Sequence, residues 1–450
     1  MDTGGNALAG TAHGPVLGRE RIASMDVLRG VAVLGILLMN IIGFAYPFAA
    51  SFDPTLGGGY TGVNLWVWAV NTVLFEGKMR AIFSMLFGAG MLVLTSRLEQ
   101  RGAAGEAADV YYRRLLWLLA FGLVHAYFIW WGDILFFYAV LGLLLFPFRR
   151  LSGKALVTIG LVLLLIGVGR EFLSAVELTG VRKAAASADA AAAAGGALTK
   201  EQKAAQAAWT ARLREARPSE EDLKPETEAY QGGYWSAFRQ RAGFLSTAQA
   251  MAIYHFFIFD IGGMMMLGIG LFKLGLFSAS LPARTYAMIA LLGFGIGLPL
   301  ASWAIRGDIL SGFDAVSLAW SAPVTALARV PIAVAHVALV MLLCQSGLLR
   351  WLTTSLAAVG QTAFSCYIAT SLICTTIFYG YGFGYFGRME RYQLYFVVAG
   401  VWVVLLIAAP IWLRYFRFGP LEWLWRSLTY VERQPMRRRE ALPSTPWQFT

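Results

Sequence analysis

Apolar runs of about 20 residues recur along the whole chain, and they constrain its fold more than any other feature. A helix of about 20 apolar residues crosses the hydrocarbon core of a bilayer, which is about 30 Å thick. The runs lack the strict alternation of lipid-facing β-strands. The chain is 58% hydrophobic and 14% charged, whereas soluble domains carry about 25% charged residues. We therefore predict an all-α fold, a polytopic transmembrane helical bundle.

About ten spans and one short half-helix are expected in this bundle. The expected spans are residues 27–48, 79–95, 114–131, 133–148, 155–174, 251–273, 283–304, 317–344, 354–378 and 392–413. The apolar segment 63–75 is too short to cross the membrane, so we predict a half-helix or an interfacial helix there. Its broken end is expected at the charged sequence FEGKMR, where protein or a cavity must surround the charges.

Short connections rich in arginine indicate the cytoplasmic side. They lie before residue 30, at 97–114, at 149–154 and after residue 413, whereas 49–62 contains no Lys or Arg. These positions agree if residues 63–95 cross the membrane once, which places both termini in the cytoplasm. The same clusters account for the formal net charge of +11, so no nucleic-acid partner is expected.

The chain divides into five expected regions. They are a disordered cytoplasmic tail (1–25), a first transmembrane half (26–178), an extracytoplasmic Ala-rich polar loop (179–248), a second transmembrane half (249–431) and a cytoplasmic tail (432–450). The first residues lack an apolar core, so no cleavable signal is expected. The polar loop has helix-forming composition, and it is either a lid over a site or a solvated excursion.

Polar side chains inside the apolar runs are the candidate functional residues, because charge at membrane depth is costly. Asp26 and Arg29 are three residues apart and can pair on one helix face, and Asn40 lies further along the same run. A helix cap and a snorkelling arginine would also explain the first two.

His125 lies within an apolar run, and Asp133 follows in the turn WWGD, so its carboxylate can fold back toward the imidazole. A histidine takes and gives protons near neutral pH, and a carboxylate orients its ring. A structural hydrogen bond between two helices is the alternative. A second pair, His255 and Asp260, is five residues apart, which is a poor match to one helix face.

Glu76, Lys78 and Arg80 surround a glycine at the expected end of the half-helix. Cations at a broken helix could hold an anionic group such as phosphate, and an interfacial anchor explains them equally well. The three cysteines lack metal-binding spacing and the sequence has no phosphate-binding loop, so no metal site is expected.

Several stretches resemble the YeiB-like bacterial inner-membrane proteins, the domain-of-unknown-function family 418. They are RIASMDVLRGVAVLGILLMNI, RRLLWLLAFGLVHAYFIWWGDILFFYAVLGLLL, AYQGGYWSAFRQR and GPLEWLWRSLTY. GQTAFSCYIATSLI resembles a further stretch, with Ser365 and Cys366 where threonine and asparagine are usual. The likeness reaches from Arg21 to about Tyr430 without the Ala-rich loop, and it implies a bacterial inner membrane.

RIASMDVLRG is also similar to the opening of the lysosomal heparan-glucosaminide acetyltransferase and, more loosely, to multi-span acyltransferases that modify surface glycans. Those enzymes transfer an acyl group from acyl-CoA with a membrane-embedded histidine. The resemblance implies that His125 is the counterpart of that histidine, and that Asp26 and Arg29 belong to the floor of the site.

We therefore expect a membrane acyltransferase that moves an acyl group, with acyl-CoA as donor substrate, to a glycan, a lipid or a small metabolite. His125, oriented by Asp133, would act as general base or carry the acyl group, while Lys78 or Arg80 would bind the donor phosphates. The expected catalytic residues are His125, Asp133 and Asp26, and the expected substrate-binding residues are Arg29, Asn40, Glu76, Lys78, Arg80, His255 and Asp260.

Two other functions fit the same sequence. A transporter or flippase for an anionic or lipid-linked small molecule would use the buried charges as its binding site and the broken segment as its gate. A membrane scaffold would use the polar loop to bind partners. Membrane lipids are the expected surroundings in every case, and small residues on the spans would allow a homodimer.

Overall fold

The computed structural model describes residues 23–100, 102–252 and 257–438, and their regular secondary structure is helical. This confirms the predicted all-α fold. The only bridge between extended residues in this part of the chain is an isolated one that joins Phe416 and Arg437. The α-helices are α1 (Ala23–Ala45), α2 (Gly62–Leu74), α3 (Lys78–Gln100), α4 (Ala107–Val124), α5 (Leu135–Leu143), α6 (Gly153–Ala193), α7 (Lys200–Ala216), α8 (Glu220–Gln231), α9 (Tyr234–Ala252), α10 (Ile258–Lys273), α11 (Ala283–Leu310), α12 (Ala315–Ser346), α13 (Arg350–Gln361), α14 (Ala363–Phe378), α15 (Arg391–Tyr415) and α16 (Pro420–Tyr430).

Six segments of the described chain are long and apolar enough to cross a membrane, and the bent pair α13 and α14 is a seventh candidate. The six are α1, the segment Gly62–Gln100, α6, α11, α12 and α15. The chain therefore has the helices of a multi-pass membrane protein.

Residues 63–75 form the short helix that the sequence predicts. α2 ends at Leu74, the chain turns at Phe75–Gly77, and α3 begins at Lys78, so the break falls within FEGKMR. Gly77 has a φ of 74°, in the left-handed region that glycine adopts without strain. α2 and α3 together form one candidate span.

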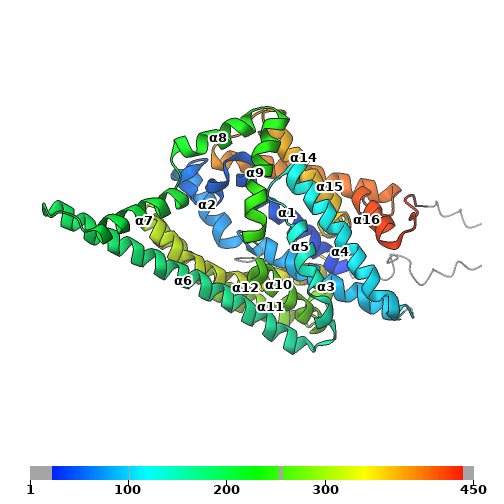
Figure 1. Cartoon of the computed structure of the whole chain (residues 1–450). Coiled ribbons are helices and arrows are strands. Elements are labelled where there is room, and N and C mark those ends of the chain that lie inside the picture. The colour runs from blue at the N-terminus through cyan, green and yellow to red at the C-terminus, as the bar shows by residue number, and fades with distance from the viewer. Residues whose placement is uncertain (1–22, 101, 253–256, 439–450) are drawn as a thin grey trace, which may run out of the picture.

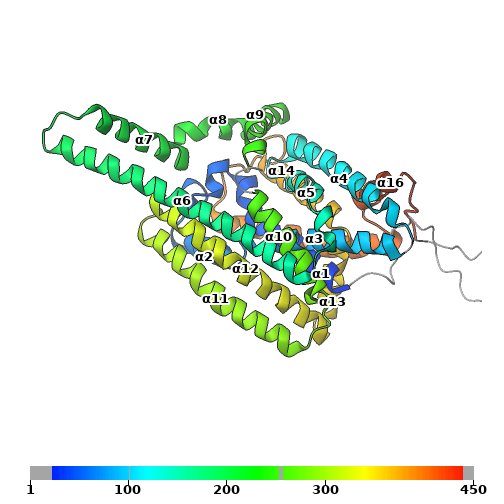
Figure 2. The same ribbon diagram turned by 60° about the horizontal axis from the view of Figure 1, so that its bottom comes forward.

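The polar region between the two halves is helical, and α6 and α9 run through its expected boundaries. α6 continues for 41 residues, well past the expected span, because alanines and charged helix formers follow, with Gly180 as the one glycine, until Gly195 and Gly196. α9 runs across the expected boundary at residue 249. α6 and α7 form a hairpin that projects from the bundle, and α8 lies across one end of the molecule (Figures 1 and 2).

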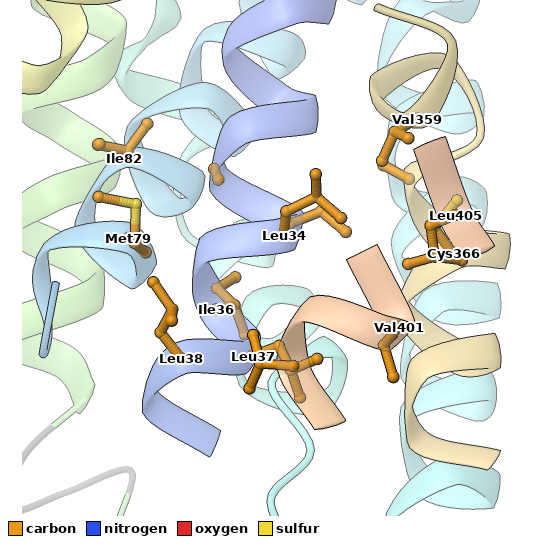
Figure 3. Packing of buried hydrophobic residues seen from close by; sticks show 14 of the residues in the cluster. Leu34, Ile36, Leu37, Leu38, Met79, Ile82, Val359, Cys366, Val401 and Leu405 are labelled. Carbon is orange, nitrogen blue, oxygen red and sulfur yellow. The ribbon is translucent and has the colours of Figure 1, made fainter. Parts of the chain in front are cut away.

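α1 is the centre of the hydrophobic core. Figure 3 shows Leu34, Ile36, Leu37 and Leu38 of α1 between Met79 and Ile82 of α3, Val359 and Cys366 of α13 and α14, and Val401 and Leu405 of α15. Glycines bring α1 and α13 into backbone contact. A Cβ atom at Gly360 would lie 1.8 Å from the Asp26 carbonyl oxygen, and one at Gly30 would lie 2.0 Å from that of Leu356. Such close approach is typical of membrane helices that pack through small residues.

Candidate functional site

His125 begins a short π-helix, His125–Ile129, at the end of α4. Such π-turns are frequent at functional sites. The chain then runs without helix through WWGD to α5, and Asp133 returns toward the imidazole. Nδ1 of His125 lies 2.8 Å from Oδ1 of Asp133, the contact that the turn sequence predicts. The other carboxylate oxygen, Oδ2, accepts a hydrogen bond from the Phe136 amide at 2.7 Å and so fixes the start of α5.

Ser371 of α14 completes a chain of three polar side chains. Its Oγ lies 2.9 Å from Nε2 of His125. If an ionised Asp133 accepts the Nδ1 proton, Nε2 carries a lone pair and accepts from the Ser371 hydroxyl, whose other acceptor is the Tyr367 carbonyl oxygen at 3.3 Å. This is the order of contacts in acid–histidine–serine catalytic triads. Sequence reasoning missed Ser371, because it lies 246 residues from His125 and is an ordinary serine in an apolar helix.

Arg241 holds the π-helix in place. Its side chain is fully buried, and it donates to the carbonyl oxygens of Tyr127 and Phe128 at 3.3 and 3.2 Å. The Tyr234 hydroxyl donates to the same Phe128 oxygen at 2.8 Å. A cation at a helix C-terminus satisfies carbonyl groups that the helix leaves unpaired. Arg241 and Tyr234 belong to the stretch AYQGGYWSAFRQR, so the sequence showed the motif but not its role.

A cavity of about 270 Å³ lies at the end of the bundle that holds the N-terminus of α1. We call it the arginine-lined cavity, because four arginines from four helices line it: Arg29, Arg97, Arg114 and Arg426. Much of the remaining wall is apolar, with Phe83, Leu86, Phe87, Met91 and Leu115 among its residues. An anionic head group and an apolar tail would both find complementary surface here.

His125 lies directly behind the inner wall of this cavity. Ile134 and Tyr367 belong to that wall. The ring centroid of Tyr367 lies 5.0 Å from that of His125, and the Ile134 amide donates to the Tyr367 hydroxyl at 3.3 Å. The imidazole itself is 1% exposed. In this conformation Tyr367 therefore separates His125 from the cavity.

Asp26 and Arg29 also line the arginine-lined cavity. Arg29 donates to Oδ1 of Asp26 at 2.8 Å, as their spacing predicts, and to the Gly360 carbonyl oxygen at 3.4 Å. The hydrogen bonds of His125 go to Asp133 and Ser371. The structure therefore places Asp26 in the wall of the cavity and not in contact with the imidazole.

Glu422 joins α16 to the N-terminus of α14 beside this cavity. Its Oε1 accepts from the amides of Phe364 and Ser365 at 2.6 and 3.1 Å, and its Oε2 accepts from the Ser365 hydroxyl at 2.5 Å. A carboxylate at a helix N-terminus satisfies free amides and complements the helix dipole. Ser365 thus has a structural partner that sequence reasoning did not find.

The break between α2 and α3 holds a second polar cluster. Arg80 donates to Oδ2 of Asp260 at 2.8 Å, and the same carboxylate pairs with Arg329 of α12. Lys78 is 2% exposed and donates to the Thr72 carbonyl oxygen at 2.6 Å, whereas Glu76 is exposed. Sequence reasoning missed Arg329, although an arginine inside an expected span was a visible signal.

The remaining candidates lie apart from the His125 site. The residues that line the arginine-lined cavity do not include Lys78, Arg80 or Asp260. Asn40 is half-buried on α1, also outside that lining. His255 lies outside the residues that the structure describes. Among those residues, no group of three or more His, Cys, Asp or Glu side chains is placed to hold a metal ion.

The chain is similar to several bacterial proteins of unknown function. Residues 271–432 match a family described as "Protein of unknown function (DUF418)". The uncharacterized protein YeiB of Escherichia coli (strain K12) is 29% identical over 418 residues, which cover 91% of this chain and 96% of YeiB. The uncharacterized protein YxaH of Bacillus subtilis (strain 168) is 29% identical over 438 residues, which cover 94% of this chain and 98% of YxaH. No solved structure matches. The C-terminal part of the chain is thus similar to the DUF418 family, and uncharacterized bacterial relatives align with the chain over nearly its whole length.

Proposed function

We propose that the protein is an integral membrane acyltransferase that moves an acyl group from acyl-CoA to a hydroxyl or amine acceptor. One observation carries this proposal. Asp133, His125 and Ser371 form a continuous chain of hydrogen bonds, 2.8 and 2.9 Å long, directly behind a cavity with arginines and apolar walls. A histidine held in this way has its Nε2 lone pair oriented for proton transfer.

The arginine-lined cavity is the proposed donor site. The phosphates of acyl-CoA would bind Arg97, Arg114 and Arg426, since guanidinium groups pair well with phosphate. The acyl thioester would lie along the apolar wall toward Tyr367. This differs from the expected use of Lys78 and Arg80, because those two belong to the separate cluster at the break between α2 and α3.

Transfer requires Tyr367 to move so that the thioester reaches Nε2 of His125. The acceptor then attacks the thioester carbonyl carbon and gives its proton to Nε2. The bond between carbon and sulfur breaks, and the leaving thiolate takes the proton from the imidazolium. Asp133 stabilises that imidazolium, and a base of this kind contributes about 10²–10⁴-fold to the rate. In a two-step variant, Nε2 first carries the acyl group.

We further propose about ten spans in a bacterial inner membrane, with both termini cytoplasmic. In this arrangement α2 and α3 form one broken crossing, as do α13 and α14, and α10 lies in the expected span 251–273. The lining of the cavity supports it. Arg29 lies near the start of α1 and Arg97 near the end of α3. If both reach one cavity at the cytoplasmic surface, the chain crosses outward along α1 and inward once along α2 and α3.

The direct test replaces His125 by alanine in protein reconstituted in nanodiscs. Wild-type protein given acetyl-CoA and a cell-envelope extract should release free CoA, and His125→Ala should abolish the release. His336→Ala is the matched control, because His336 bonds only the Ile332 carbonyl oxygen of its own helix among the described contacts. A folded His125→Ala protein with full transfer activity would contradict the mechanism.

Transport of an anionic small molecule is the second candidate, and the polar cluster at the helix break favours it. Arg80, Asp260 and Arg329 are paired where α2 ends and α3 begins, and broken membrane helices commonly form the binding sites of transporters. Counterflow of labelled acetyl-CoA or phosphate into liposomes, without release of free CoA, would support transport over transfer.

A further inference from the structure

A second cavity lies at the opposite end of α1, under α8. It has a volume of about 520 Å³ and is lined by residues of α7, α8 and α9, together with Phe48 and Trp131 of the transmembrane half. We call it the α8 pocket. Most of its lining belongs to the polar region between the two halves, of which α8 lies over this end of the molecule in Figure 1. Its size falls in the range of small-molecule sites.

The α8 pocket borders the His125 site from the side opposite the donor cavity. Trp131 lines the pocket and stands two residues before Asp133. The ring of Trp131 packs on that of Trp130, with centroids 5.3 Å apart, and Trp130 lies 6.4 Å from the imidazole of His125. Trp131 and Trp130 of the WWGD turn thus connect the lining of the α8 pocket to the imidazole.

One wall of the α8 pocket is aromatic. Phe48 lies 5.0 Å from Trp131 and 4.7 Å from Phe244, and Trp131 lies 5.9 Å from Phe244, measured between ring centroids. The three rings come from three separate segments of the chain. Tyr230, which is 2% exposed, extends this wall. The wall offers flat apolar faces with little conformational freedom.

The lining of the α8 pocket also contains hydrogen-bond acceptors. Glu226 uses Oε1 to accept from the Phe48 amide at 3.0 Å. Within the described part of the chain its Oε2 has no hydrogen bond, and neither has the Gln240 amide. Three carboxylates, Glu215, Asp222 and Glu226, face one arginine, Arg214, so the lining is net negative. This charge disfavours phosphorylated ligands and suits neutral or amine-bearing ones.

We propose that the α8 pocket binds the acceptor and that the acceptor is a neutral or amine-bearing carbohydrate. This rests on the proposed acyl transfer. A sugar ring presents apolar C–H faces that pack on aromatic rings, and hydroxyl groups that donate to carboxylates and amides. Both kinds of surface line the α8 pocket. Its hydroxyl or amine would reach His125 when the side chains of Trp130 and Trp131 move aside while Asp133 keeps its contact with the imidazole.

Saturation-transfer NMR on the nanodisc-embedded protein tests the pocket without any need for catalysis. The probes are maltotriose, chitotriose and glucosamine. We expect saturation of at least one probe, and about a tenfold weaker affinity in Glu226→Gln, the loss that follows from removing one hydrogen bond to a charged group. Phe244→Ala should also weaken the affinity for the same probe, because it removes one ring of the aromatic wall.

Glu228→Gln is the matched control. Glu228 is exposed on the same helix, and its described ion pair is with Lys224 at 3.8 Å. It should bind as wild type does. His125→Ala should also bind the probe while losing transfer, which separates a failure of the pocket from a failure of the mechanism. Absence of saturation for all three probes, or unchanged affinity in both pocket variants, would overturn the proposal.

Discussion

His125 is held at both ring nitrogens, and the two contacts have different consequences. Asp133 fixes the tautomer and the ring plane, since its carboxylate is itself held by the Phe136 amide. Ser371 occupies the nitrogen that must take the proton. In the proposed mechanism Asp133 is therefore needed in every step, whereas Ser371 must give way before the acceptor can bind Nε2.

Asp133→Asn should lower kcat by about 10⁴-fold, because an amide in that place favours the wrong tautomer of the imidazole. The donor KM should change little, since Asp133 does not belong to the lining of the arginine-lined cavity. Steady-state release of free CoA measures both constants. Asp308→Asn is the control. Asp308 of α11 is also a buried carboxylate, and it accepts a hydrogen bond from the Ser317 hydroxyl of α12. Equal kcat values in the two variants would refute the role of Asp133.

Ser371→Ala should leave transfer active and lower kcat by about tenfold, the effect of one lost hydrogen bond on the position of the ring. In the wild-type protein, no acyl group should accumulate on Ser371. Mass spectrometry of the acid-quenched enzyme checks this, with His125→Ala as the inactive reference. A variant as inactive as His125→Ala would instead make the serine a nucleophile.

At the scale of helices, the bend between α13 and α14 is the feature that the sequence did not reveal. The expected span 354–378 is broken at residues 361–362 by a turn of 87°. The segment has no proline there to signal a break. Glu422, 57 residues further along the chain, accepts the hydrogen bond of the Ser365 amide at the start of α14. The bend thus depends on a distant residue, which local sequence patterns do not report.

The break between α2 and α3 could be predicted because its cause is local. A short apolar segment, a glycine with positive φ and three charged residues all occur within FEGKMR. The contact of His125 with Asp133 was predictable for the same reason, as the WWGD turn joins them. Ser371, Arg241 and Arg329 reach their sites across more than 65 residues, so only the folded chain identifies them.

Glu422→Ala should destabilise the fold by about 1–3 kcal/mol, because the amides at the start of α14 would lose their acceptor inside the protein. Thermal unfolding in detergent, followed by circular dichroism, measures the effect as a lower Tm. Glu432→Ala is the control, since Glu432 is exposed beyond the end of α16. The same Tm for both variants would mean that Glu422 does not support the bend.

Gly360→Ala should disrupt the packing of α13 on α1, because the added Cβ would lie 1.8 Å from the Asp26 carbonyl oxygen. Overpacking of this kind costs about 1–3 kcal/mol. Gly400→Ala on α15 is the control, as a Cβ there meets nothing within 4 Å. Size-exclusion profiles and Tm values in detergent should separate the two variants. If Gly360→Ala is as stable as Gly400→Ala, the backbones of α1 and α13 do not approach each other this closely.

For the whole molecule, the two cavities lie at opposite ends of one helix. α1 has 23 residues, which corresponds to about 34 Å at about 1.5 Å per residue. Arg29 near its start lines one cavity, and Phe48 beyond its end lines the other. The His125 site borders both through Tyr367 and through Trp130 and Trp131. In the proposed function, donor and acceptor would therefore enter from different sides of the membrane.

Membrane vesicles of known orientation test this separation. Acyl-CoA does not cross a bilayer, so inside-out vesicles should release free CoA when it is added, and intact right-side-out vesicles should not. Permeabilising the right-side-out vesicles should restore the release.

In inside-out vesicles Arg114→Gln should raise the donor KM about tenfold, by loss of one charge-assisted contact. The neighbouring Arg113→Gln should not, because Arg113 is not part of the cavity lining. Equal release from intact vesicles of both orientations would show that the donor does not enter only through the arginine-lined cavity. The proposed entry of donor and acceptor from opposite sides would then be wrong.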